Sequence, residues 1–314
     1  MIEIRGLTKR FGDTVAVDDI SFDVVPGRVT GFLGPNGSGK STTMRVIMGL
    51  DWPTSGTVSV NGQPYHRHRR PLFEVGALLD AKAIHGGRTA YNHLLSLAQS
   101  NGIPRNRVDE VIERVGLGSV ARKRAGGFSL GMSQRLGIAA ALLGNPGVML
   151  FDEPVNGLDP EGIRWIRNLL RSLAAEGRTI LVSSHLMSEM SLTADHLIVI
   201  GRGRLIADTS VQEFIDRSAQ NFVRVRSPRL EELARAINAR GGKTRTEPDG
   251  ALAVSGLQIS AVGDLAQDAG IVLLELSPQL ASLEEAFMEF TRESVEFHAD
   301  ADPARTPAAI GKEA

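Results

Sequence analysis

Hydrophobic residues in the first part of the chain recur in short runs that alternate with amphipathic segments. Three early runs, residues 2–4, 20–24 and 57–60, have the alternation of half-buried strands, and Pro26-Gly27 and Asn61-Gly62 are typical of turns. Together they predict a small antiparallel sheet lying beside a larger sheet.

Three other runs are apolar at almost every position, which is typical of strands buried on both faces. These runs are Val29–Leu33, Val148–Phe151 and Thr179–Ser183. Helical periodicity appears between and beside them, over residues 108–115, 134–143 and 164–175. The alternation predicts an α/β fold with a mostly parallel core sheet covered by helices.

The pattern changes near residues 218–221. Two helices follow, over residues 230–239 and 259–269, and four short strands. The strands are predicted at residues 222–226, 243–246, 252–254 and 271–276. Their order, βαββαβ, is that of the ferredoxin-like α+β arrangement. We therefore expect two domains, at residues 1–217 and 218–298, and interpret the second as an interaction module.

A last amphipathic helix is predicted over residues 283–290. It places Leu283, Phe287 and Phe290 on one face, and such a stripe is more often a docking surface than a cofactor site. Residues 299–314 are rich in Ala, Asp and Pro with few apolar side chains, so we expect a disordered tail.

Composition narrows the possible partners. The chain has 314 residues, 35 Lys and Arg against 36 Asp and Glu, and no cysteine. Near-neutral charge gives no global attraction to nucleic acid, and the absence of cysteine excludes disulfides and thiolate metal sites. No run approaches the roughly 20 apolar residues of a membrane span, and residues 1–5 lack the features of a signal peptide. We therefore expect no secretion by that route.

The strongest local signal follows the apolar strand that ends at Leu33. It is Gly34-Pro35-Asn36-Gly37-Ser38-Gly39-Lys40-Ser41, followed by Thr42, and it matches GxxxxGK[ST]. Glycines let the backbone amides surround phosphate oxygens, and the helix that begins here adds its positive end. Lys40 can reach the β- and γ-phosphates, and the Ser41 hydroxyl can bind Mg²⁺. The alternative is a glycine-rich turn with a surface lysine.

A second signal is the acidic pair Asp152-Glu153 at the end of an apolar strand. Ligands bind at the carboxyl edge of such sheets, and a nucleotide site needs a carboxylate for its metal and a group that positions water. We predict that Asp152 binds Mg²⁺ and that Glu153 is the general base. Without the phosphate loop, the pair would be interpreted as a solvated strand end.

These motifs, with others in the same order, resemble the ABC ATPases over residues 1 to about 215. Residues 128–135, Phe-Ser-Leu-Gly-Met-Ser-Gln-Arg, are similar to the family's LSGGQ signature. Ser129 and Gly131 are retained, whereas Leu130 and Met132 depart from the pattern. The resemblance implies a P-loop nucleotide-binding domain with a mostly parallel core sheet, an antiparallel β subdomain and a helical subdomain.

Further positions follow from the same resemblance. Gly157-Leu158-Asp159 is similar to the D-loop, and His185 follows a strand as the family's switch histidine does. Phe11 occupies the place of the aromatic ring that stacks on adenine. Without the resemblance, Phe11 would be a core or turn residue and His185 a structural one.

One position departs from the family. The Q-loop glutamine, which joins the Mg²⁺ site to the membrane subunit, aligns with Asp80. A carboxylate there can still bind Mg²⁺ directly or through water. Asp80, the irregular signature and the C-terminal extension together resemble the drug- and antibiotic-export branch, whose ATPase subunits pair with a separate membrane protein.

The resemblance implies an ATPase that uses ATP and Mg²⁺ and closes on a second copy of itself. The signature Ser129 and Gly131 would then cap the nucleotide bound by the opposite chain. The protein would act at the cytoplasmic face of the membrane, bound to a separate polytopic permease.

Alternatives remain open at this point. One is a soluble ABC-type ATPase of translation or DNA repair, which usually has two nucleotide modules or a long coiled coil. A second is a module that holds ATP without cleaving it, and a third is an importer. The basic cluster at residues 66–70 lacks interleaved aromatic residues, so we interpret it as a solvated loop and expect no nucleic-acid partner.

Overall fold

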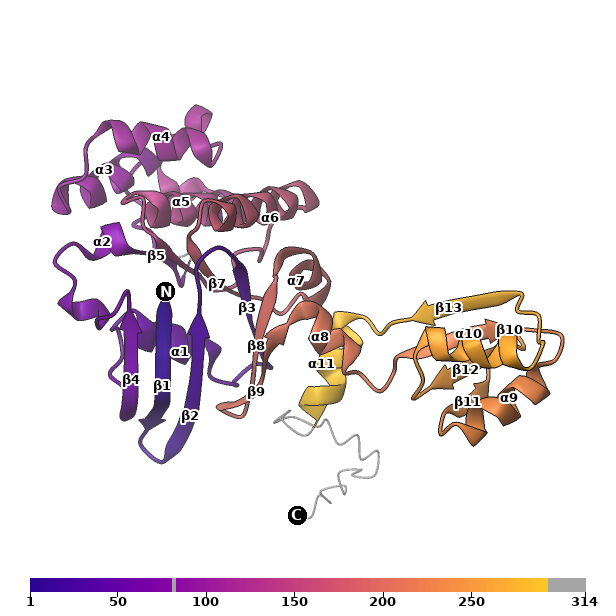
Figure 1. Cartoon of the computed structure of the whole chain (residues 1–314). Helices are drawn as coiled ribbons and strands as arrows, with labels where there is room; N and C mark the ends of the chain where they lie inside the picture. Colours follow the sequence, from indigo (N-terminus) through magenta and orange to yellow (C-terminus); the bar gives the residue numbers. More distant parts are fainter. Residues whose placement is uncertain (81–82, 293–314) are drawn as a thin grey trace, which may run out of the picture.

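The computed structural model describes residues 1–80 and 83–292 of the chain. Its named strands form three sheets, of six, three and four strands. Figure 1 shows the six-stranded and three-stranded sheets side by side on one part of the molecule and the four-stranded sheet on another part. The tail predicted to be disordered, residues 299–314, lies outside the described residues.

The six-stranded sheet carries the predicted central strands. Its strand order is β5 (Val75–Leu78), β6 (Val148–Phe151), β7 (Thr179–Ser183), β3 (Val29–Leu33), β8 (His196–Gly201) and β9 (Arg204–Ser210). The first five strands pair in parallel, and β9 is antiparallel to β8. The mostly parallel core is thus confirmed, whereas β5, β8 and β9 were not predicted.

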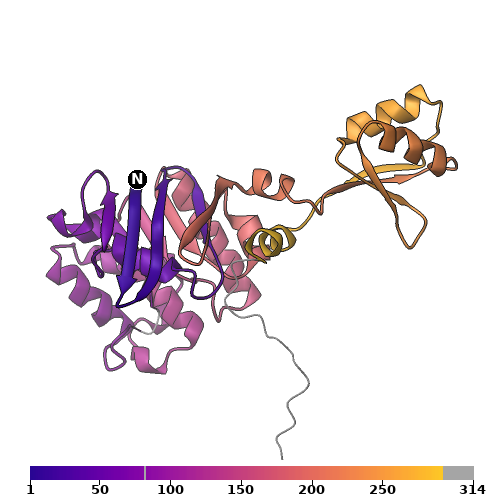
Figure 2. The same ribbon diagram turned by 90° about the horizontal axis from the view of Figure 1, so that it is seen from below.

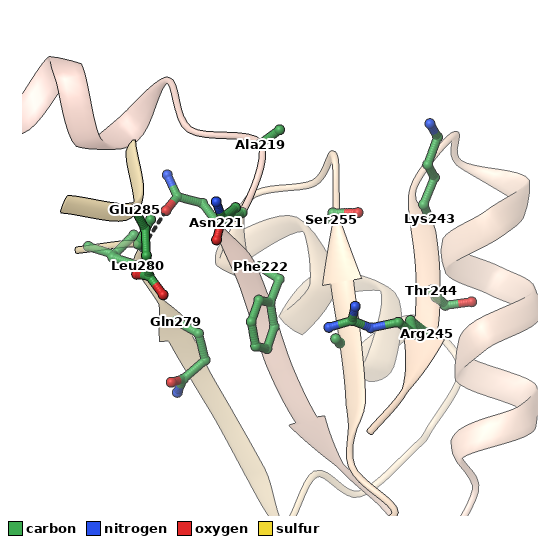
Figure 3. A pocket seen from close by; sticks show the side chains of 13 residues that line it. Ala219, Asn221, Phe222, Lys243, Thr244, Arg245, Ser255, Gln279, Leu280 and Glu285 are labelled. Atoms are coloured by element: carbon green, nitrogen blue, oxygen red, sulfur yellow. Dashed lines mark hydrogen bonds between the residues drawn. The ribbon is translucent and has the colours of Figure 1, made fainter. Parts of the chain in front are cut away.

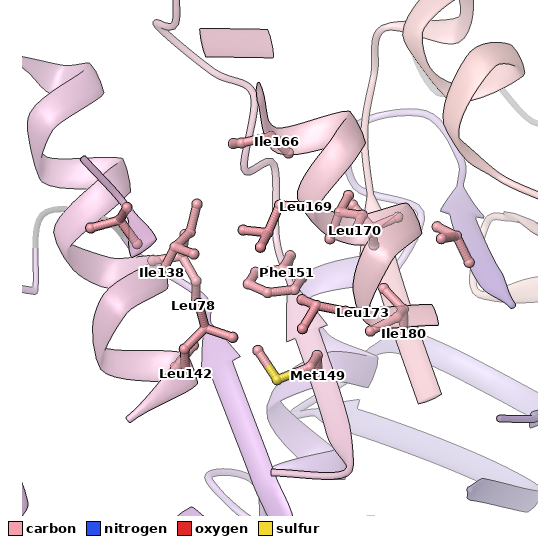
Figure 4. Close-up of a cluster of buried hydrophobic side chains, with 14 of the residues drawn as sticks. Leu78, Ile138, Leu142, Met149, Phe151, Ile166, Leu169, Leu170, Leu173 and Ile180 are labelled. Atoms are coloured by element: carbon pink, nitrogen blue, oxygen red, sulfur yellow. The ribbon is translucent and has the colours of Figure 1, made fainter. Parts of the chain in front are cut away.

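The central strands are mostly apolar because each contributes to two cores. In β6, Val148 and Leu150 join one buried cluster, and Met149 and Phe151 join the other. Successive strand residues point to opposite faces, so a sheet covered on both sides needs apolar residues at every position. Figure 4 shows the second cluster, where Met149 and Phe151 meet side chains of two covering helices.

Those covering helices are α5 (Leu130–Leu142) and α6 (Pro160–Ala175). Both begin earlier than the periodicity predicted, because Ser129 and Asp159 cap them. The Ser129 hydroxyl accepts from the Met132 amide at 3.2 Å, and the Asp159 carboxylate accepts from the Gly162 amide at 2.9 Å. Such caps satisfy amides that the helix itself leaves free.

The other face of the sheet is covered by α1 (Lys40–Ile47) and the predicted antiparallel flap. The flap has the order β2 (Thr14–Val24), β1 (Ile2–Phe11) and β4 (Ser55–Val60), and both pairings are antiparallel. Its first two strands are longer than predicted, because register shifts let the ladder continue past the regular alternation.

The remaining elements of this part are short or lie at its rim. They are η1 (Tyr65–Arg67), α2 (Pro71–Glu74), α3 (Ala90–Ser100), α4 (Asn106–Arg114), η2 (Gly118–Val120), η3 (Ala125–Gly127), α7 (Met187–Thr193) and α8 (Val211–Asp216). Of these, only α4 was predicted. No helix within the described ranges is long and apolar enough to cross a membrane.

The four-stranded sheet belongs to the small C-terminal part. Its strand order is β11 (Lys243–Thr246), β12 (Leu252–Ser255), β10 (Phe222–Arg226) and β13 (Glu275–Gln279). Helices α9 (Leu230–Ala239) and α10 (Ile259–Asp268) connect the strands in the order βαββαβ, and every pairing is antiparallel. Val225, Leu233, Val254 and Val262 lie in a separate buried cluster.

The prediction of the last strand, at residues 271–276, was wrong in its position. Residues 271–274 of the predicted run are not in the ladder, and among them Val272 is 68% exposed and Leu274 is 70% exposed. Pairing begins only at Glu275, opposite Arg226, where the partner strand β10 ends. The ladder is therefore limited by the neighbouring strand rather than by hydrophobicity along the chain.

The final helix, α11 (Leu283–Thr291), returns to the first part of the molecule (Figure 2). Leu283 and Phe287 are buried in the cluster that also contains α5 and α6, and the Phe290 ring lies 5.0 Å from that of Phe214. The predicted docking stripe is thus confirmed. Residues 218–298, predicted as the second domain, therefore include a helix that packs in the first core.

The two connections to the small part are tied together. Asn221 accepts from the Ala281 amide and donates to the Ile215 carbonyl, each at 2.7 Å. The Glu289 carboxylate of α11 accepts from the Ser218 hydroxyl at 2.7 Å. Both connections are therefore anchored to α8 and α11 rather than free.

Helix α5 approaches β5 so closely that Gly76 has no room for a side chain. A Cβ there would lie 2.0 Å from the Ala141 carbonyl oxygen. We expect Gly76→Ala to lower the free energy of unfolding by about 1–3 kcal/mol, because the helix must shift. Gly147→Ala is the control, since nothing lies within 4 Å of its Cβ. Urea unfolding of both proteins tests this, and equal midpoints would contradict it.

Candidate nucleotide site

The phosphate loop joins β3 to α1 in a shape that requires glycine. Gly37 and Gly39 have φ of 79° and 103°, in the left-handed region. A Cβ on Gly39 would also lie 2.5 Å from the Ala16 carbonyl oxygen. The loop and the first turn of α1 therefore present backbone amides to one small volume, an arrangement suited to phosphate.

Lys40 lies inside this loop with 8% of its surface exposed. Its Nζ donates to the Gly34 carbonyl at 2.6 Å and to the Pro35 carbonyl at 3.0 Å. Burial lowers the pKa of the Lys40 ammonium, and the nearby Glu153 and Asp152 carboxylates counteract that shift. A cation is thus held where a polyphosphate would exchange the carbonyl contacts for charged ones.

Asp152 is held between two hydroxyl groups. The Ser41 hydroxyl donates to Oδ2 at 2.8 Å, and the Ser183 hydroxyl donates to Oδ1 at 2.5 Å. Ser41 and Asp152, predicted from separate motifs, are therefore brought together. A hydroxyl and a carboxylate on adjacent elements are oxygen ligands of the kind that Mg²⁺ uses.

Contacts of its amide, carbonyl and carboxylate orient Glu153, the next residue. Its φ of 50° lies in the left-handed region, and its amide donates to the Ser183 hydroxyl at 3.0 Å. The Gln134 side chain donates to its carbonyl at 3.2 Å. The carboxylate Oε2 lies 2.7 Å from His185 Nδ1 and accepts from the His185 amide at 3.3 Å. An oriented carboxylate of this kind can accept a proton from water.

These groups border a cleft of about 350 Å³. Its lining residues are Ala16, Asn36, Gly37, Ser38, Gly39, Lys40, Ser41, Thr42, Leu79, Asp152 and Glu153. A larger hollow of about 560 Å³ lies on the small part of the molecule and shares none of these residues (Figure 3). The chemistry therefore gathers in the smaller cleft.

The residues of the cleft fit a magnesium nucleotide. Within residues 1–80 and 83–292, the buried Ser38 hydroxyl has no hydrogen-bond partner, which leaves a polar atom at the loop for a ligand. The same ranges contain no cluster of three His, Asp or Glu side chains that could hold a metal alone. Mg²⁺ typically completes its coordination with water and substrate phosphates, so a site with few protein oxygens, such as those of Ser41 and Asp152, fits this metal.

Ser129, Gly131 and Asp159 do not line this cleft. Ser129 and Asp159 are exposed and cap α5 and α6. The two helix starts pack on each other, because a Cβ on Gly131 would lie 3.1 Å from a Leu158 methyl group. The signature and the D-loop thus form one exposed surface outside the chain's own site.

Two other predicted residues, Phe11 and Asp80, do not line the cleft. The Phe11 ring ends β1, is 50% exposed, and lies under the Lys9 ammonium at 4.7 Å. Asp80 is exposed just beyond β5, and its neighbour Leu79, not Asp80 itself, is among the residues that line the cleft. The adenine contact and the Asp80 metal ligand therefore stay predictions.

Sequence reasoning missed Ser183 and Gln134. Ser183 holds both Asp152 and the Glu153 amide, and the buried Gln134 side chain holds the Glu153 carbonyl. The signal for Ser183 was a buried polar residue at the end of an apolar strand. No signal in the sequence showed which carboxylate it would meet.

Comparisons with known proteins agree with this geometry. A family model described as ABC transporter matches residues 17–156, and one described as a domain of unknown function matches residues 221–284. An uncharacterized ABC transporter ATP-binding protein of Bacillus subtilis, YhcH, is 36% identical over 300 residues, which are 94% of this chain and 97% of that protein.

The bacitracin transport ATP-binding protein BcrA of Bacillus licheniformis is 42% identical over 211 residues, 66% of this chain and 69% of its own. A solved ATP-binding subunit of an ABC transporter superposes with a TM-score of 0.64 at 25% identity, covering 69% of this chain and 92% of its own. The chain belongs to the ATP-binding proteins of ABC transporters. It is an ATPase that uses ATP with Mg²⁺, and subunits of this family dimerise and pair with membrane permeases.

Removal of the Ser183 hydroxyl tests how the acidic pair is held. Ser183→Ala leaves Asp152 Oδ1 and the Glu153 amide without this partner. We expect the Mg²⁺ concentration for half-maximal ATP hydrolysis to rise at least tenfold, because hydrogen bonds behind a metal ligand affect metal affinity by that order. Ser188→Ala, at an exposed position of α7, is the control. A Mg²⁺ titration identical to that of the wild type would contradict the assignment.

Proposed function

We propose that the chain powers export of drugs or other small hydrophobic compounds by closing on a second copy of itself around two ATP molecules. The observation that carries the proposal is a division of the site. Lys40, Ser41, Asp152 and Glu153 meet in one cleft, whereas the signature residue Ser129 is exposed outside it. A second chain is needed to bring a signature to each cleft.

Within one chain, the phosphate loop and Lys40 bind the phosphates, and Ser41 and Asp152 hold Mg²⁺, with Asp80 as a further ligand. Mg²⁺ held by these residues would neutralise charge on the phosphates. Glu153 accepts a proton from the attacking water. His185 contacts the Glu153 carboxylate and keeps that carboxylate oriented toward the γ-phosphate. Phe11 stacks on the adenine ring.

The opposite chain supplies the signature. Helix α5 runs for 13 residues, so its first amides carry the positive end of a full helix dipole. Ser129 and Gly131 lie at that end, and Asp159 caps the adjacent helix. A γ-phosphate held from both sides joins the protomers, and its loss on hydrolysis releases them.

Export is supported by relatives whose names refer to transport of bacitracin and of lantibiotics. The membrane partner in our proposal is a separate polytopic permease, and the protein acts at the cytoplasmic face of the membrane through that partner. The small C-terminal part is an interaction module. A drug-susceptibility panel on cells with and without the ATPase and permease genes tests export directly, and unchanged susceptibility to every compound would count against it.

Replacement of the proposed base separates binding from cleavage. We expect Glu153→Gln to reduce ATP turnover by about a thousandfold while ATP binding persists, because the amide cannot accept the proton. Sedimentation with saturating MgATP should show a stable dimer. Glu113→Gln, at an exposed position of α4, is the control. Wild-type hydrolysis by Glu153→Gln would show that the base is assigned wrongly.

A bulky cation at the signature tests its action in the partner's site. We expect Ser129→Arg to bind ATP with unchanged affinity, since Ser129 lies outside its own cleft, and to lose both dimerisation and hydrolysis. Nucleotide fluorescence measures the first property and phosphate release the second. Ser100→Arg, at an exposed position of α3, is the control. ATPase activity that survives in Ser129→Arg would refute the role of the signature.

A further inference from the structure

Helix α7 begins two residues after His185 and has seven residues. An isolated helix of this length is not stable in water, so its position depends on its neighbours. It lies between α6 and α11 (Figure 1). Whatever fixes α7 against these helices also fixes the backbone that carries His185.

One ion pair joins α7 to α6. Arg167 Nη2 lies 2.6 Å from Glu189 Oε2, and each side chain is 24% exposed. The buried Nε of Arg167 has no hydrogen-bond partner among the described residues, so the guanidinium depends on Glu189. Loss of either partner leaves a partly buried charge without compensation.

The packing around this pair is incomplete. A cavity of about 20 Å³ is lined by Arg167 and Glu189 and, on its other walls, by Pro154 and Ser184. Pro154 follows Glu153, and Ser184 precedes His185. Atoms that line a void lack packing contacts on one side. The position of the backbone beside Glu153 and His185 therefore depends more on the ion pair than it would in a fully packed core.

We propose that Arg167 and Glu189 are positioning residues for His185 and, through it, for the Glu153 carboxylate. The proposal rests on the proposed function, in which Glu153 is the base. Neither residue lines the nucleotide cleft, where other side chains hold the phosphates. Loss of the pair therefore displaces the group that acts on water and leaves the groups that bind ATP in place.

The test compares Arg167→Met, Glu189→Gln and the double variant in ATP hydrolysis by the full chain. We expect kcat to fall about tenfold in each single variant with KM within about twofold, because small displacements of a catalytic group slow the chemical step. The double variant should be no slower than the slower single variant, since both remove the same interaction. Exchange of the partners, Arg167→Glu with Glu189→Arg, should recover part of kcat.

Arg5→Met provides the control, because it breaks an ion pair of the same length, Arg5 with Asp23 at 2.6 Å, that joins two strands of the flap. Its kcat should stay within about twofold of the wild type. Thermal unfolding of every variant measures the folded fraction, to which rates are normalised. The proposal would be overturned if the normalised kcat were unchanged in both single variants. It would also be overturned if the two single effects on kcat multiplied in the double variant, as independent effects do.

Failure of this proposal differs from failure of the proposed function. If Glu153→Gln is inactive and Glu189→Gln keeps the wild-type kcat, the base stands and the positioning role is wrong. If Glu153→Gln hydrolyses ATP at the wild-type rate, Glu153 is not the base, and positioning of its carboxylate has no role in catalysis.

Discussion

The parallel register of β3, β7 and β6 places the reacting groups at one edge of the sheet. Phe32 pairs with Ser183, and Phe151 pairs with Val182, so the phosphate loop, Ser183 and Asp152 all leave the sheet at the same level. The strand ends are close enough for the Ser183 hydroxyl to bind the Asp152 carboxylate. A slip of one residue in either pairing would turn the side chains to the opposite face and separate these groups.

The same edge explains why the signature lies outside the chain's own cleft. The strand ends position Lys40, Ser41, Asp152 and Glu153, but the signature residue Ser129 begins a helix of the covering layer and is exposed beyond the cleft. Helix α6, capped by Asp159, packs beside it. The chain's own cleft lies on one side of this packing, and the surface proposed to complete the partner's site lies on the other. The buried face of α5 and α6 connects the two.

Much of the main fold could be predicted because its causes are local. Burial on both faces makes Val148–Phe151 apolar throughout and gives Thr179–Ser183 an apolar centre, and the spacing of the glycines identifies the phosphate loop. Ser183 could not be assigned, since its partners are set by strand register. The strand predicted at residues 271–276 failed for a similar reason: the ladder stops where β10 stops, whatever the hydrophobicity beyond it. The Arg167 and Glu189 pair joins two helices and leaves no pattern in either.

Each active site is proposed to be built from two chains, and complementation between two inactive variants tests this arrangement. Lys40→Ala lacks a phosphate-binding lysine but keeps Ser129, whereas Ser129→Arg has the reverse defect. In an equal mixture, we expect ATPase activity that neither variant has alone, because a mixed dimer has one site in which both the lysine and the signature are intact. Random pairing, with half of the dimers mixed, sets an upper limit of about a quarter of the wild-type rate. A mixture no more active than its two components would contradict the proposed arrangement.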